Sequence, residues 1–304
     1  MNRSVRLIAV GIVWAMALAM PAALWCQGPA PEAATYAIQF NRPQTKGSSY
    51  RLAMEMKVHS EGSMGIGEGS QGGSQEMAAA LAGTVRVIDV NAVGDPVMMI
   101  FHVDKADLTQ DKKATALKIT GADLGISLFQ GQFRFVRRDG QAIPKEEIEL
   151  LSQVFQAPTG VNPDDYLGAG RAVRPGETWK INSAVMAKAL SREGQEGEGA
   201  KKKGLDPANL DGTVTFVGLE PWGDIPCFHL RTAVTIKNPA IPHFIGEGST
   251  QIVSDQLLPR DTASAKSKES TQIESRLRGK FISDDGKKLD VTNHSTVTVE
   301  TTIE

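Results

Sequence analysis

The sequence predicts a mainly β protein, with long antiparallel curved sheets built from two related halves and one or two short helices. Three observations predict this class. Polar and apolar residues alternate along several long segments, turn signals containing Gly separate these segments, and two stretches of the chain repeat. Of the 304 residues, 41% are hydrophobic and 22% charged, a balance that is typical of globular proteins and excludes a disordered or collagen-like chain.

Alternation with a period of two predicts strands that bury one face and expose the other. Three segments show it most clearly. Their apolar members are Leu52, Met54, Met56 and Val58; Phe228, Leu230, Val234 and Ile236; and Leu289, Val291, Val297, Val299 and Ile303. The residues between them are mostly charged or carry hydroxyl groups, so we expect one face of each strand to be in water.

The internal repeat consists of two aligned blocks, whose corresponding residues lie 129 positions apart. Residues 46–52 align with 175–181, and residues 83–95 align with 212–224, where each block ends in Gly-Asp. A duplication predicts that each half opens with a strand after a Gly turn and continues into a hairpin. The alternative is chance similarity between two ordinary hairpins, because Gly, Thr and Val are common in strands and turns.

The predicted layout is a signal peptide (1–28), a linker (29–35), a first β half (36–160) and a second β half (161–304), with one core shared by the halves. Residues 157–170, rich in Pro and Gly, separate the halves. Gly-rich polar stretches at 60–74 and 192–204 predict flexible connections. Helices are predicted after Pro144, where an acidic first turn precedes apolar residues at helical spacing, and from Asn182 to Leu190.

The N-terminus has the pattern of an export signal. Arg3 and Arg6 precede an uncharged apolar run at 7–25. We therefore expect the protein in the periplasm or at the cell exterior. Two alternatives stay open: the run is long enough to remain as an N-terminal membrane anchor, and Cys26 stands where a lipoprotein is lipidated, although Trp25 before it departs from the small residues of that signal.

Charge and motifs argue against several classes of function. The net charge is −2 with both signs interspersed, and Lys201–Lys203 is an isolated run, so no nucleic-acid partner is expected. The five histidines lack the spacing of a metal site, although Cys227 and His229 share a strand face. Residues 67–72 spell G-x-G-x-x-G without the strand and helix that a dinucleotide site needs. We expect no cofactor and no metal.

Four residues are predicted to bind a ligand. Tyr50 and Trp179 occupy equivalent repeat positions, and Met54 and Met56 alternate on the strand that follows Tyr50. Aromatic rings offer a flat apolar contact surface, and Met side chains adapt to irregular apolar shapes. Together they predict an apolar binding surface; packing in the core is the alternative role for the same residues.

The segment Arg174-Pro175-Gly176-Glu177-Thr178-Trp179 opens the second half of the chain. It resembles a strand entry in a domain-of-unknown-function family of secreted bacterial β-rich proteins, a resemblance that implies no known activity. The architecture is also similar to the periplasmic lipoprotein-carrier and lipid-binding half-barrels. That second resemblance implies a curved sheet that wraps an apolar cavity.

From these observations we expect an exported, non-catalytic envelope protein that binds an apolar, lipid-like ligand or another envelope component. The alternative is a protein–protein interaction or structural scaffold module that uses its sheet edges. A hydrolase with a dispersed site is a third alternative, because a triad can assemble without a local motif. A membrane is expected as a partner only through an uncleaved leader.

Overall fold

The computed structural model describes residues 34–65, 71–110, 113–192, 205–239, 244–264, 266–282 and 288–304. Chain contacts separate Met1–Ala34 from Thr35–Glu304, and every element named below belongs to the second unit. The predicted signal peptide, Cys26 and Lys201–Lys203 lie outside the described residues, as does most of the predicted linker.

The strands are β1 (Ser49–Gly65), β2 (Gln71–Val90), β3 (Pro96–Gln110), β4 (Lys113–Ala116), β5 (Asp123–Phe129), β6 (Gln132–Arg137), β7 (Thr178–Lys180), β8 (Leu210–Trp222), β9 (Ile225–Lys237), β10 (Phe244–Pro259), β11 (Ser267–Ile282) and β12 (Lys288–Ile303). The helices are α1 (Lys145–Val154), α2 (Asp164–Leu167) and α3 (Ser183–Arg192), with a 3-10 turn, η1, at Pro207–Asn209. In the part of the chain described, no helix is long and apolar enough to cross a membrane.

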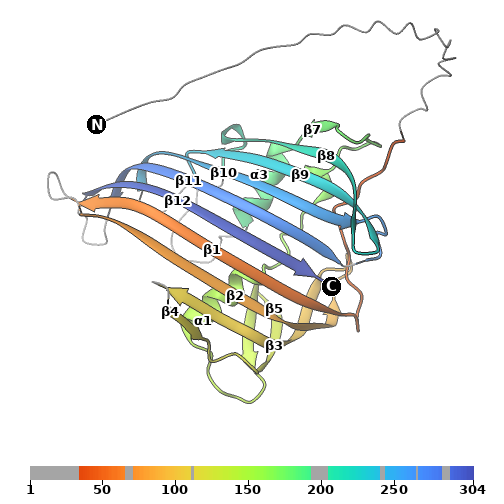
Figure 1. Cartoon of the computed structure of the whole chain (residues 1–304), viewed down its shortest axis with the longest axis horizontal. Coiled ribbons are helices and arrows are strands. Elements are labelled where there is room, and N and C mark those ends of the chain that lie inside the picture. Colours follow the sequence, from red (N-terminus) through yellow and green to blue (C-terminus); the bar gives the residue numbers. More distant parts are fainter. Residues whose placement is uncertain are drawn as a thin grey trace, which may run out of the picture. The chain divides into compact units, whose positions relative to one another are not determined.

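The described strands form one sheet of 12 strands in the order β6-β5-β3-β2-β1-β12-β11-β10-β9-β8-β7, with β4 paired to β3 (Figure 1). Every pairing is antiparallel. This confirms the predicted mainly β class. The pairing of β1 with β12 joins the start of the first half to the end of the chain, which explains why all the strands belong to a single sheet.

The sequence repeat is also a repeat of structure. Tyr50 lies opposite Val85 across β1 and β2, and Trp179 lies opposite Val214 across β7 and β8. The residues on either side pair in step, again with an offset of 129 positions. In the sheet, β3, β2 and β1 follow each other in the same direction as β9, β8 and β7, so the two copies stand in tandem.

The repeat extends to an irregularity that the sequence did not reveal. The register of β2 with β3 shifts between Val87 and Asp89, and the register of β8 with β9 shifts between Phe216 and Gly218. These positions correspond at the same offset. A bulge adds a residue to one strand and increases its local bend and twist, so both copies curve at the same place.

The turn that opens each copy depends on a glycine in the left-handed region. Gly47 has a φ of 86° and Gly176 a φ of 82°. The amide of Gly47 donates to the carbonyl of Val87 over 2.9 Å, and the amide of Gly176 donates to the carbonyl of Phe216 over 2.6 Å. The Gly turn thus anchors the first strand of each copy to the bulge in the second.

Replacing either turn glycine by alanine is expected to lower the free energy of unfolding by about 1–2 kcal/mol, and by a similar amount at both sites. The added Cβ would meet nothing within 4 Å at Gly47 or Gly176, so the cost comes from the backbone conformation alone. Denaturant unfolding of the two variants measures it. Gly73→Ala is the control, because its Cβ would also be free and its φ is not positive. Clearly unequal costs at the two turns would show that the turns are not equivalent.

The copies differ after their first strands. β1 continues to Gly65, whereas β7 ends at Lys180 and the chain turns into α3. The flexible connection predicted at 60–74 is wrong at both of its ends, because Ser60 to Gly65 and Gln71 to Ser74 are paired in β1 and β2. Their small polar side chains suit strands in water, and the backbone pairing that forms the strands does not depend on apolar content. Residues 66–70 and 193–204 of the predicted connections lie outside the described residues.

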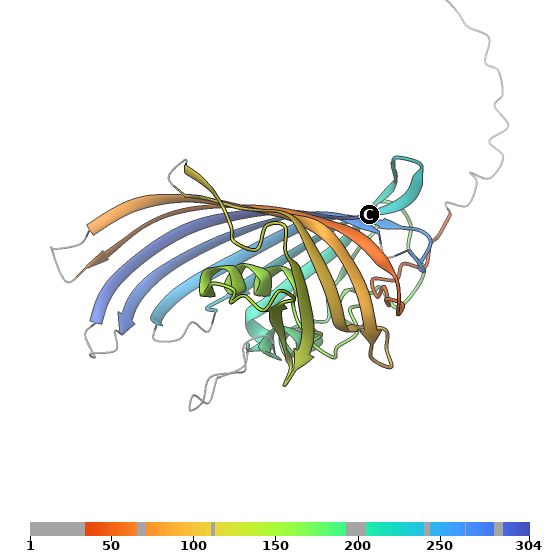
Figure 2. The same cartoon turned by 90° about the horizontal axis from the view of Figure 1, so that it is seen from below.

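Buried apolar residues form two clusters, where the sequence had led us to expect one shared core. The first lies over β1, β2, β3 and β5 and includes Leu150 and Leu151 of α1 and Phe155, which follows the helix. The second lies over β8 and β9 and includes Ala187 of α3 and Phe40 from the segment before β1. Both helices lie on the hollow side of the curved sheet (Figure 2), which we call the concave face. The opposite side is called the convex face.

Two carboxylates fix the covering segments. Glu147 of α1 is only 4% exposed and accepts hydrogen bonds from the amides of Lys118 and Ile119, over 2.9 and 3.0 Å. Asp164 of α2 accepts from the amides of Phe40 and Asn41. A buried carboxylate that receives two backbone donors is satisfied, and it holds the segments it joins in place. Helices α1 and α2 are therefore attached by polar contacts as well as apolar packing.

Candidate functional site

The two faces of the central strands differ sharply in chemistry. On β1, Met54, Met56 and Val58 point to the concave face, whereas Glu55 and Lys57 point to the convex face and are exposed. Residues that pair directly across strands point to the same face, so the register assigns the side chains of β12, β11, β10 and β9 to the two faces in the same way. The convex face carries frequent charges, while the concave face carries apolar and hydroxyl side chains. The predicted alternation of β1, β9 and β12 is confirmed.

An apolar row crosses the concave face. Directly paired residues on six neighbouring strands form it, and we call them the apolar row: Met77, Val58, Val297, Ile273, Ile252 and Val234. With neighbouring strands about 4.8 Å apart, the row is roughly 24 Å long. Val234 is buried and the other five are half-buried. The row therefore offers an extended apolar surface that water still reaches.

The helices border this surface and leave its middle open. Met56 packs on the cluster beneath α1, and Ile252 packs on the cluster beneath α3. Val58, Val297 and Ile273 pack on neither cluster. Figure 1 shows α1 near β2 and β3 and α3 near β8 and β9, and the strand order places β1, β12 and β11, which carry the middle of the apolar row, between these two groups of strands. We call this part of the concave face, the apolar row between the two helices, the trough.

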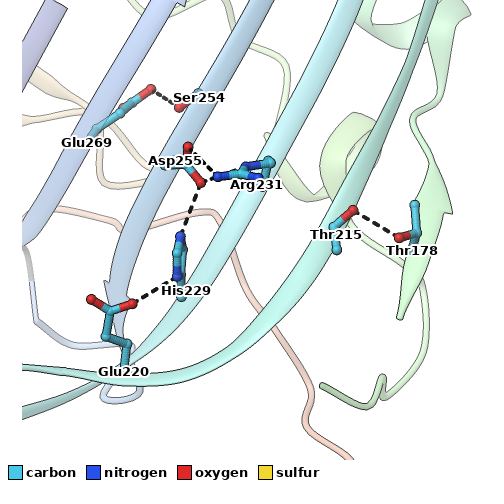
Figure 3. A network of polar contacts seen from close by, with 8 residues as sticks. All are labelled: Thr178, Thr215, Glu220, His229, Arg231, Ser254, Asp255 and Glu269. Atoms are coloured by element: carbon cyan, nitrogen blue, oxygen red, sulfur yellow. Dashed lines mark hydrogen bonds and ion pairs between the residues drawn. The ribbon is translucent and has the colours of Figure 1, made fainter. Parts of the chain in front are cut away.

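A single carboxylate lies on the concave face of these central strands. Glu269 of β11 occupies the concave face four residues from Ile273, a distance of roughly 13 Å along the strand. Its Oε1 accepts hydrogen bonds from Ser254 Oγ, over 2.7 Å, and from Thr271 Oγ1, over 2.9 Å. Figure 3 shows the contact between Ser254 and Glu269 across the two strands. Among the described residues, it is the only carboxylate or basic side chain on the concave face of β1, β2, β9, β10, β11 and β12.

The structure brings three of the four predicted ligand residues together. Tyr50, Met54 and Met56 follow one another on the concave face of β1. Met54 is 6% exposed and belongs to the cluster under α1, whereas Met56 is half-buried at the edge of the trough. Trp179 lies at the far edge strand, β7, where its Nε1 donates to the carbonyl of Leu167 over 2.6 Å. The structure places only Met56 of these residues beside the trough.

Tyr50 is expected to titrate as a core residue. Burial raises its pKa from 10.0 to about 12. A folded-state pKa above the unfolded value means that stability present below pH 10 is lost as the pH rises from 10 to about 12. A spectrophotometric titration of the wild type minus that of Tyr50→Phe should show one phenol that ionises near 12. A difference spectrum centred near 10 would place Tyr50 in solvent and contradict its position under α1.

The convex face carries a polar network that joins β8, β9 and β10 (Figure 3). His229 lies between Glu220, 2.9 Å from Nδ1, and Asp255, 3.1 Å from Nε2. Arg231 donates to both oxygens of Asp255. Burial alone would raise the pKa of Asp255, but hydrogen bonds from Arg231 and His229 hold this pKa below its usual range. Paired acid and base groups in this arrangement stabilise the contact between strands.

No described group of three or more His, Cys, Asp or Glu residues has the arrangement of a metal site. Cys227, which the sequence placed on the face of His229, is 1% exposed, and burial raises the pKa of its thiol. A buried thiol with a raised pKa reacts poorly as a nucleophile. Two surface hollows, of about 480 and 380 Å³, are lined mainly by convex-face side chains, Arg276 and Lys57 among them.

Sequence reasoning missed most of the trough. Val58, Val297 and Ile252 belong to strands whose pairing is not visible locally, and Ile273 is flanked by polar residues in β11. Alternation in the C-terminal segment placed Val297 and Val299 on one face. This was a local pattern that could have identified a residue of the apolar row as a site residue. The position of Glu269 on the same face follows only once the register of β11 with β12 is known.

No family model matches the chain. No curated protein matches it in sequence either. Three solved structures resemble the fold at low similarity. A chain of lipovitellin, described for its lipid–protein interactions, is 7% identical, with a TM-score of 0.33 over 84% of this chain and 25% of that one. OpdQ of Pseudomonas aeruginosa is 6% identical, with a TM-score of 0.22 over 84% and 98%. A DUF1329 family protein of Desulfovibrio piger is 9% identical, with a TM-score of 0.13 over 81% and 83%.

The chain spans about a quarter of the length of the lipovitellin chain. No family model assigns the chain to the kind of domain-of-unknown-function family that residues 174–179 resemble.

Proposed function

We propose that the chain is a non-catalytic protein that binds an apolar, lipid-like ligand in the trough on its concave face. The observation that carries the proposal is the apolar row, in which five half-buried apolar side chains lie side by side on five neighbouring strands. A contiguous apolar surface of this kind is costly to leave in water, and in soluble proteins it commonly marks a binding site.

The form of the row suits a chain-like ligand. It is roughly 24 Å long, and its members follow one line across the strands. A hydrocarbon chain laid along it would contact Val58, Val297 and Ile273 in turn, with α1 and α3 at either end. Transfer of apolar area out of water yields roughly 25 cal/mol per Å², which favours an extended ligand over a compact one.

We also propose that the protein is exported and has no catalytic activity of its own. The export proposal rests on the N-terminal pattern of residues 1–25. The proposal of no catalysis rests on the convex network, where the imidazole of His229 contacts two carboxylates and the neighbouring hydroxyl of Ser254 projects to the other face. A panel of ester, peptide and glycoside substrates tests it, since turnover of any of them would establish an enzyme.

Ligand binding is tested on the purified chain. An apolar fluorescent probe, whose emission rises when it leaves water, should bind saturably and be displaced by a long-chain alcohol. Mass spectrometry of an organic extract of the protein, purified without detergent, should recover an apolar molecule in near-stoichiometric amount. Absence of both saturable binding and a retained molecule would overturn the proposal.

A sheet edge supports a second candidate function, that of an interaction module. β6 ends the described sheet, so its outer edge pairs with no described strand. Val136 of β6 is 61% exposed and Phe129 of β5 46%. An exposed edge with apolar side chains can accept a strand from a partner. If envelope extracts yield a partner that the Val136→Lys variant, with a charge on the edge strand, no longer captures, this function is supported; a partner captured equally by both would exclude the edge.

A further inference from the structure

One charged side chain on the concave face, that of Glu269, indicates which kind of polar head group the ligand carries. On the concave face of β1, β2, β9, β10, β11 and β12, Glu269 is the one described carboxylate or basic side chain among apolar, amide and hydroxyl groups. Its direct neighbours across the strands are Gln256 of β10 and Thr301 of β12, both uncharged. The side chain is half-buried, so a ligand lying in the trough would reduce its contact with water further.

The hydrogen bonds of Glu269 leave it incompletely satisfied. The hydroxyls of Ser254 and Thr271 both donate to Oε1. Together they orient the carboxylate, but no described cation lies within ion-pair distance of it, in contrast to Glu274 on the convex face of the same strand, which pairs with Arg276 and His294. Covering a carboxylate with hydrocarbon is costly unless a donor or a cation replaces the lost water.

We propose that Glu269, oriented by Ser254 and Thr271, binds a positively charged, hydrogen-bond-donating head group of an amphiphile whose chain extends along β11 to the apolar row. This inference rests on the proposed function and specifies the class of ligand as an alkylammonium amphiphile. Glu269 lies roughly 13 Å along β11 from Ile273, so a chain held by its head group at Glu269 would run along the concave side of β11, over Thr271, before it reaches the apolar row. An anionic head, such as a carboxylate or phosphate, would be repelled at the same place.

Three probes of equal chain length test the assignment: dodecylammonium, dodecanol and dodecanoate, each measured as a competitor of the fluorescent apolar probe. The wild type is expected to bind dodecylammonium about tenfold or more tightly than dodecanoate, in keeping with a charge-assisted hydrogen bond. Added salt should reduce the preference. In Glu269→Gln, which keeps the shape of the side chain, the two charged probes should bind with nearly equal affinity while dodecanol is little changed.

Glu300→Gln is the matched control, because it makes the same chemical change at an exposed convex position of β12, and it should retain the wild-type preference. Circular dichroism spectra and melting temperatures confirm that each variant is folded. If all three probes bind the wild type alike and Glu269→Gln changes nothing, the head-group assignment is wrong and the apolar site stands. If none of the probes binds, the proposed function itself fails. A preference for dodecanoate would also overturn the assignment.

Discussion

Replacing Ile273 by glutamate is expected to abolish binding of the apolar ligand and leave the fold intact. Ile273 is the central member of the apolar row, paired with Val297 on one side and Ile252 on the other. A carboxylate there would be covered by the hydrocarbon of the ligand, a cost of several kcal/mol that corresponds to a loss of affinity of about a hundredfold or more. Fluorescence titration with the apolar probe measures the loss.

The control for this variant is its neighbour in the chain. Gln272→Glu adds the same charge one residue away, on the exposed convex face of β11. It should bind the probe as the wild type does. Because Ile273 is only half-buried, we expect its replacement to cost less than about 2 kcal/mol of folding stability. Equal loss of binding in both variants, or in neither, would place the ligand away from the apolar row.

Phe101→Ala is expected to cause the largest loss of stability, about 3–5 kcal/mol in the free energy of unfolding. The Phe101 ring is fully buried in the cluster under α1 and lies edge-on to Phe155, with ring centroids 5.1 Å apart. Its removal leaves a cavity between the sheet and the helix that borders the trough. Denaturant unfolding gives the magnitude. His102→Ala, on the exposed side of the same strand, should cost about 1 kcal/mol or less.

Milder substitutions test whether the two clusters are separate. Phe101→Leu and Phe216→Leu each alter one cluster and should cost less than about 1.5 kcal/mol. Because the clusters share no described buried residue, the double variant should lose the sum of the two effects to within about 0.5 kcal/mol. A coupling energy well above that value would show that the halves pack as one core.

The sequence was informative where the signal was local. The Gly turns at Gly47 and Gly176, the alternation along β1 and the helix after Pro144 were all predicted from neighbouring residues, since backbone conformation and amphipathic period are read within a short window. The bulges at the shared offset were not predicted. A bulge depends on the count of residues opposite each other across two strands, and this count is not visible in either strand alone.

The candidate site was predicted only in part because its residues meet through long-range register. Val58 and Val297 are direct neighbours in the sheet although they come from opposite ends of the described chain. Tyr50 and Trp179 hold equivalent positions in the repeat, but they are far apart in the sheet. Their surroundings correspond, but the tandem arrangement of the copies puts β8 to β12 between their strands. Equivalent positions in a repeat therefore gave no information on whether the two residues lie close together in the sheet.

The most direct test of the account is to map where a bound hydrocarbon chain touches the protein. A long-chain alcohol that carries a photoreactive diazirine is bound, irradiated and located by peptide mass spectrometry. We predict that labels concentrate on Met56, Val58, Val297 and Ile273, the concave side of the central strands. Labels on convex residues such as Lys57 or Gln272, or labels spread evenly over the chain, would contradict a ligand site in the trough.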